Sequence, residues 1–183
     1  MSHPTYLIAS DIHGSAFFAQ ELLEAFQREQ ADALLLLGDI LYHGPRNDLP
    51  LGYAPKKVIT LLNPLADKIT CVRGNCDAEV DQMVLSFPMM ATYAWLSVDG
   101  HTVYATHGHH NGHDDPPPLT RGEILLHGHT HLPALERREG YVYLNPGSVS
   151  LPKGGNPPTY MMWEDGTVSL CGMDGTRIET LVL

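Results

Sequence analysis

The chain has 183 residues, 43% hydrophobic and 17% charged, which suits a single folded domain over residues 1–183. Its formal net charge of −10 disfavours a long nucleic acid as a partner. No apolar run approaches the roughly 18 residues of a membrane helix, and the N-terminus lacks a signal-peptide pattern. Three cysteines give no disulfide framework, so we expect a cytoplasmic protein without a membrane partner.

The first elements predict a parallel βαβ unit. Residues 6–10 fit a buried strand, and Ser15 can cap a helix whose apolar side chains recur at helical spacing. A second buried strand is expected over 33–37. Because ligands bind at the carboxyl ends of parallel strands, polar residues there are candidate site residues. They are Asp11, His13 and Asp39.

A third strand repeats this pattern. Pro55 suits the first turn of a helix, and the run 69–72 then predicts a buried strand. That strand also ends in polar residues, the Arg-Gly-Asn-Cys-Asp segment 73–77.

From about residue 89 the pattern changes to short, mostly antiparallel strands. Residues 95–98 and 102–106 flank an Asp-Gly pair that is typical of a type I′ hairpin turn. Further strands are expected over 124–127, 135–144 and 159–181. Two tight loops, 145–148 and 152–156, can close over a site.

Two pairs of polar residues occur at one-residue spacing just after an apolar run. If these segments are extended, alternate side chains point the same way. Asp11 would then converge with His13, and His129 with His131.

Carboxylate, amide and imidazole groups at strand ends form a set of seven candidate metal ligands. Seven are too many for one tetrahedral zinc and divide naturally between two divalent ions, with one carboxylate bridging. Ligand type alone leaves Mn²⁺, Fe²⁺, Zn²⁺ and Ni²⁺ open. The seven are Asp11, His13, Asp39, Asn75, His107, His129 and His131.

Each of these residues also has a structural alternative when it is taken singly. Asp11 and Asp39 suit turns, as does Asn75, and a lone His107 is more often structural. Five clusters that each follow a predicted strand favour the metal site.

Five short motifs occur in a fixed order: Asp-x-His, Gly-Asp, Gly-Asn-x-Asp, His-Gly-His and Gly-His-x-His. This order resembles the signature of calcineurin-like metallophosphoesterases. The segments 43–47, 52–55, 73–77, 145–150 and 152–157 further resemble the bacterial YfcE-type phosphodiesterases. The resemblance implies an α/β fold, a four-layer αββα sandwich with mixed parallel and antiparallel sheets.

The same resemblance implies a dinuclear site that is typically supported by Mn²⁺. In the implied assignment, one ion is held by Asp11, His13 and His131, the other by Asn75, His107 and His129, and Asp39 bridges them.

One position departs from the wider superfamily, where a histidine is thought to protonate the leaving oxygen or steady the transition state. Here Cys76 stands instead, as in the YfcE-type group, so we expect preference for esters with good leaving groups. His109 is a candidate to assist; alternatively it orients a ligand or faces solvent. Arg46 and Arg73 are candidate phosphate clamps, although Arg73 can equally pair with Asp77.

We therefore predict a metal-dependent hydrolase of small phosphodiesters, in which a hydroxide bound by two metal ions attacks phosphorus. The candidate catalytic residues are Asp39, Arg73, Asn75, Cys76, Asp77 and His109. One alternative is a phosphomonoesterase, including a protein phosphatase, and another is a metal-binding protein-interaction scaffold of the same fold. A homo-oligomer is also considered, with Tyr53, Tyr93 or Trp95 at its interface, although core packing is favoured for each.

Overall fold

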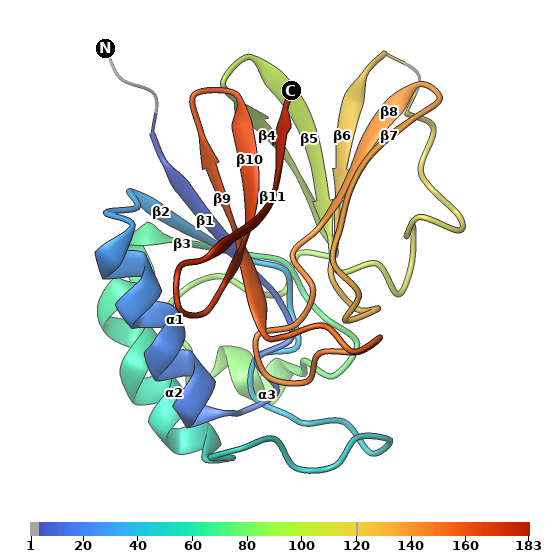
Figure 1. Ribbon diagram of the computed structural model, residues 1–183. Coiled ribbons are helices and arrows are strands. Elements are labelled where there is room, and N and C mark those ends of the chain that lie inside the picture. Colours follow the sequence, from blue (N-terminus) through green and yellow to red (C-terminus); the bar gives the residue numbers. More distant parts are fainter. Residues whose placement is uncertain (1–3, 120) are drawn as a thin grey trace.

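Two β-sheets stack face to face in the computed structural model, which describes residues 4–119 and 121–183 (Figure 1). The first sheet has six strands in the order β11-β10-β9-β1-β2-β3. Its members are β1 (Tyr6–Ala9), β2 (Ala33–Leu36), β3 (Ile69–Cys71), β9 (Thr159–Glu164), β10 (Thr167–Gly172) and β11 (Arg177–Val182). As predicted, β1, β2 and β3 are parallel.

The helices lie on one side of this sheet (Figure 1). They are α1 (Ala16–Arg28), α2 (Pro55–Leu62), the 3-10 helix η1 (Asn63–Lys68) and the short α3 (Glu79–Gln82). The predicted cap of α1 is confirmed, because Ser15 Oγ accepts a hydrogen bond of 3.1 Å from the Phe18 amide. The predicted start of α2 at Pro55 is also confirmed.

Because successive side chains of β1 and β2 point to opposite faces, the first sheet has a hydrophobic core on each face. Leu7 and Leu34 pack with Leu22 of α1 in the helix-side core. Ile8 and Leu35 point the other way and pack against the second sheet.

The second sheet has five strands in the order β4-β5-β6-β8-β7. These are β4 (Tyr93–Val98), β5 (His101–Thr106), β6 (Glu123–Leu126), β7 (Ala134–Arg138) and β8 (Tyr141–Asn145). Positive φ angles of 49° and 82° at Asp99 and Gly100 agree with the predicted hairpin turn. The C-terminal half is mostly antiparallel, as predicted, although β5 pairs with β6 and β6 with β8 in parallel. A long connection returns the chain between β5 and β6 and so permits this pairing.

Irregular chain covers part of the outer face of the five-stranded sheet. The described residues 107–119 and 121–122 run there and form no helix (Figure 1). Leu119 from this segment packs with Tyr104 and Tyr143 of the sheet. The predicted α/β sandwich of two mixed sheets is therefore confirmed, with a loop rather than helices over this face.

Core packing is the wrong prediction for two aromatic residues. Tyr93 and Trp95 are 49% and 53% exposed, because they lie on the edge strand β4. Both rings contact Tyr104, at centroid distances of 5.1 and 4.9 Å.

Among the described helices, none has the length and apolar character needed to cross a bilayer.

Candidate metal centre

The seven candidate ligands all lie in loops that follow strand ends. The loops after β1, β2 and β3 meet at the carboxyl edge of the six-stranded sheet, as expected for parallel strands. The loops after β5 and β6 approach from the second sheet, and Gly128 would place a Cβ only 1.9 Å from Ser10 Oγ. This close approach requires glycine at position 128.

A first group of ligands surrounds Asp11. Its Oδ1 atom lies 3.5 Å from His13 Nε2 and 3.2 Å from His131 Nε2. The two Nε2 atoms are 3.3 Å apart. Within the described residues, no group makes a hydrogen bond of acceptable geometry to this buried oxygen. The three side chains can hold a cation together.

A second group surrounds His107. Its Nε2 atom lies 3.0 Å from Asn75 Oδ1 and 3.2 Å from His129 Nδ1. An amide oxygen and two imidazole nitrogens thus face a common point, which suits a borderline divalent ion.

Asp39 lies between the two groups. Its Oδ2 atom is 3.7 Å from His13 Nε2 and 3.5 Å from His107 Nε2. Its other oxygen accepts a hydrogen bond of 2.8 Å from the Cys76 amide. This position fits a carboxylate that bridges two ions.

Main-chain carbonyl groups fix the orientation of three histidine rings. The Nδ1 atoms of His13, His107 and His131 lie 2.9, 2.6 and 2.6 Å from the oxygens of Tyr42, Leu37 and Leu151. A carbonyl oxygen only accepts, so each Nδ1 carries a proton and each Nε2 is the ring nitrogen left to face a metal. Together with the bare oxygen of Asp11, this donor set fits divalent cations.

The backbone at these ligands differs from the predicted extended conformation. Five of the seven have φ between 50° and 64°, in the left-handed region: Asp11, His13, Asp39, His129 and His131. Alternation along an extended strand is therefore not what brings these side chains together. Asp11 still meets His13, whereas His129 turns to His107 and His131 to Asp11.

The buried carboxylates and histidines stabilise one another's charged forms. Burial alone would raise the pKa of Asp11, but His13 and His131 outweigh it and hold this pKa well below its ordinary value. For His107, burial opposes protonation, but the hydrogen bond to Asp39 and the charges of Asp11 and Asp39 raise its pKa to about 9. A metal ion must therefore displace a proton from His107.

Asp77 has a positioning role in this structure. It is buried, and its carboxylate accepts hydrogen bonds from the amides of Asp39 (2.8 Å), Ile40 (2.9 Å) and Gly74 (2.7 Å). Burial is the main cause that raises its pKa, partly offset by these bonds. Asp77 therefore ties the loop after β2 to the loop after β3.

Arg73 is the predicted site residue that the structure does not bring to the centre. Its Nε donates to the main-chain oxygen of Asp77 at 3.1 Å, and its Nη1 lies 3.7 Å from Glu79. The role of phosphate clamp therefore stays a prediction for Arg73, without support from these contacts. The guanidinium is occupied within its own loop, close to the alternative of pairing with Asp77.

Replacing Asp77 with alanine is expected to destabilise the protein by about 3 kcal/mol, because three amide groups lose their acceptor. At about 2–4 °C per kcal/mol, the midpoint of thermal unfolding should fall by roughly 6–12 °C. Asp67→Ala, at an exposed position, serves as the control. A loss no larger than that of the control would contradict the role of Asp77.

An open cleft of about 590 Å³ lies over the ligands. Arg46, the other predicted clamp, lines it, as do Thr130 and Asp114. Lys153 also lines it. The loop of this lysine is held beside the ligands, because the Lys153 amide donates a hydrogen bond of 3.1 Å to the main-chain oxygen of His131. The sequence indicated that this loop can close over a site, but it did not single out the lysine.

Cys76 and His109 border the ligands with different electrostatic properties. Burial and the charge of Asp39 raise the pKa of Cys76, so it remains a thiol. Burial and the neighbouring His107 lower the pKa of His109 to about 4, so its ring is neutral near pH 7. A neutral ring can form a hydrogen bond but supplies no imidazolium proton, which favours the orienting alternative for His109.

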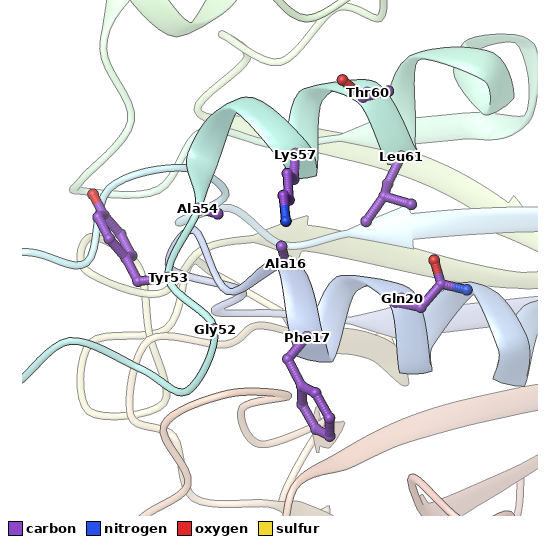
Figure 2. Close-up of a pocket in the computed structure, with 9 residues that line it drawn as sticks. All are labelled: Ala16, Phe17, Gln20, Gly52, Tyr53, Ala54, Lys57, Thr60 and Leu61. Carbon is purple, nitrogen blue, oxygen red and sulfur yellow. The ribbon is translucent and has the colours of Figure 1, made fainter.

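A different cavity, of about 630 Å³, is similar in size to the cleft but contains none of the candidate ligands. It lies between α1 and α2, and Figure 2 shows Lys57 of α2 pointing toward Ala16 of α1. Its lining is mainly apolar and includes Phe17 and Leu61. Size therefore does not identify the reactive site here; the converging ligand atoms do.

Comparisons with known proteins identify the family. Residues 5–166 match the calcineurin-like phosphoesterase superfamily domain. The chain is 46% identical over 172 residues to phosphodiesterase YfcE of Escherichia coli strain K12, with 94% of each sequence covered. The solved structure of that phosphoesterase superposes with a TM-score of 0.94 at 45% identity, over 97% of this chain and 98% of that one.

Vps29 of Entamoeba histolytica, solved as a complex with Zn²⁺, shares the fold at 21% identity, with a TM-score of 0.65 over 97% and 98% of the two chains. The prediction of a phosphoester hydrolase is thus confirmed at the level of the family. The chain belongs to the calcineurin-like phosphoesterase superfamily.

Proposed function

We propose that the protein is a metal-dependent phosphodiesterase that hydrolyses small phosphodiesters at a site for two divalent cations, with Mn²⁺ favoured. The observation that carries this proposal is the position of the Asp39 carboxylate, within 3.7 Å of both ligand groups. A relative that is 46% identical is named a phosphodiesterase, which supports the same reaction. The free cysteines fit a cytoplasmic location.

The first ion would be held by Asp11, His13 and His131, and the second by Asn75, His107 and His129. Once bound, two such ions supply a hydroxide nucleophile at neutral pH and positive charge for the phosphoryl oxygens.

The remaining side chains of the cleft bind and discriminate the ester. Arg46 and Lys153 line it and contribute cationic groups for the phosphate. Cys76 presents a weakly acidic thiol, so little proton transfer to the leaving oxygen is available from this position. Diesters with good leaving groups are therefore the favoured substrates.

Hydrolysis by chelator-stripped protein tests this function, with and without added Mn²⁺. We expect Mn²⁺ to restore cleavage of bis(p-nitrophenyl) phosphate in preference to p-nitrophenyl phosphate. Restored activity on the monoester alone would instead favour a phosphomonoesterase. Metal binding at two ions per chain without turnover of either ester would favour a protein-interaction scaffold.

A further inference from the structure

A second cavity, of about 420 Å³, adjoins the metal cleft. It is formed by the segment 108–115, and it shares Asp114, His129 and Thr130 with the cleft. A substrate whose phosphate lies over the ligand groups can therefore extend one substituent into this cavity. The volume falls within the range of about 300–1,000 Å³ that is usual for small-molecule sites.

The walls of this cavity suit an uncharged, ring-bearing group. His109, His110 and His113 contribute imidazole rings. Asp114 and Asp115 contribute carboxylates, and His113 Nε2 lies 3.3 Å from Asp114 Oδ1. Aromatic rings stack on imidazoles, whereas the carboxylates disfavour a substituent that carries a further negative charge.

The segment is held in place by His127, a fully buried residue at the end of β6. Its Nε2 atom accepts a hydrogen bond of 3.0 Å from the His113 amide. Its Nδ1 atom lies 3.0 Å from the Gly128 oxygen, so Nδ1 carries the proton. Both ring nitrogens are therefore engaged, and the tautomer is set by the main chain.

Ring stacking adds a second attachment. The His127 ring is nearly parallel to that of His113, at 13° and 5.4 Å, and it stacks on Tyr143 at 4.9 Å. The guanidinium of Arg138 covers Tyr143 at 4.6 Å from its centroid. At the start of the segment, a Cβ on Gly108 would lie 2.4 Å from His127 Nδ1. Gly108 and His113 of the cavity wall thus both contact this one histidine.

We propose that this cavity receives the second ester group of the phosphodiester, as an uncharged ring-bearing alcohol, and that His127 is the residue that positions its wall. The inference rests on the proposed function, and it explains why such an enzyme prefers phosphodiesters to phosphomonoesters. A phosphomonoester has no second ester group and gains nothing from the cavity. A diester gains binding energy on the side where the cavity adjoins the cleft.

The test compares two diesters that release the same p-nitrophenolate, in the presence of Mn²⁺. Bis(p-nitrophenyl) phosphate retains an aromatic ester group, and methyl p-nitrophenyl phosphate retains only a methyl group. For the wild-type protein, KM for the aromatic diester should be about tenfold lower than for the methyl diester. His127→Phe keeps a ring but removes the acceptor for the His113 amide.

This variant should raise KM for the aromatic diester about fivefold and change that for the methyl diester by less than about twofold. His127→Gln supplies an amide oxygen near the Nε2 position and should restore most of the difference between the substrates. His101→Phe lies outside the site, on β5, and serves as the matched control.

Nuclear magnetic resonance gives a readout that is independent of turnover. In the wild-type protein, His127 should show the Nδ1-protonated tautomer and the His113 amide should exchange slowly with solvent. In His127→Phe that protection should be lost, while the midpoint of unfolding falls by only a few °C, as expected for the loss of the bonds of one side chain. Rapid exchange of this amide in the wild-type protein would overturn the positioning role.

The kinetic outcomes separate the two proposals. Equal KM values for the two diesters in the wild-type protein would overturn the subsite and leave the proposed function standing. An equal change for both diesters in His127→Phe would overturn the positioning role in the same way. Cleavage of neither diester would overturn the proposed function and the subsite with it.

Discussion

Replacing Asp39 with asparagine is expected to lower kcat/KM for bis(p-nitrophenyl) phosphate by roughly 10³-fold or more. The Asp39 carboxylate faces His13 and His107 from a position between the two ligand groups. Asparagine offers a single neutral oxygen, and its NH₂ group would face ligand nitrogens. The change removes one negative charge from a bridging position.

Metal analysis should accompany the kinetics. Bound Mn²⁺ should fall from two ions per chain to one or fewer, while Asp67→Asn, at an exposed position, retains both. The amide oxygen of the introduced asparagine can still accept from the Cys76 amide, so the fold should survive. Two tightly bound ions and near-normal turnover in Asp39→Asn would contradict the bridging assignment.

Replacing Cys76 with histidine is expected to raise kcat for diesters of simple alcohols by about 10²-fold. An alkoxide is a poor leaving group, so its departure depends on a proton donor, and the thiol has a raised pKa. The Cys76 Sγ atom lies close to ligand atoms of His13 and Asp39, which places an imidazole here beside the reacting ester. Cleavage of bis(p-nitrophenyl) phosphate should change only a few-fold, because p-nitrophenolate leaves without protonation.

The slope of rate against the pKa of the leaving alcohol measures this effect. We expect a steep slope in the wild-type protein and in the control Cys76→Ser, and a shallower one in Cys76→His. Gly44 packs near the thiol, where a Cβ would lie 3.0 Å from Sγ, so the imidazole must extend into the cleft. An unchanged slope with intact metal binding would refute the role assigned to this position.

The sequence predicted most of the elements because their signals are local. A cap such as Ser15 and a two-residue period such as Leu7-Ile8 depend on neighbours in the chain. The candidate ligands were found for a related reason, since parallel strands deliver their carboxyl ends to one edge. What failed depended on contacts between distant segments. The covering of the outer sheet face, and with it the exposure of Trp95, has no local pattern.

In the site, too, contacts between distant segments could not be predicted from the sequence. Nothing in the order of residues says that Arg73 donates to the Asp77 main chain, or that His127 bonds to the His113 amide. Lys153 lies in a predicted loop, but the loop approaches His131 through a tertiary contact that no local sequence pattern predicts. Residue types predicted the chemistry. Only the folded structure distinguishes the groups that face the cleft from those that hold its loops together.

The left-handed backbone at five ligand residues has a consequence for how such a chain can change over generations. This conformation costs a residue with a side chain about 1–2 kcal/mol, whereas it costs glycine almost nothing. A mutation from ligand to glycine therefore destroys the metal site while relaxing the chain that carries it. Selection for stability alone would erase the centre and leave the sandwich intact. Side chains at these five positions, at angles between 50° and 64°, thus cost the metal-free fold stability that glycine would restore.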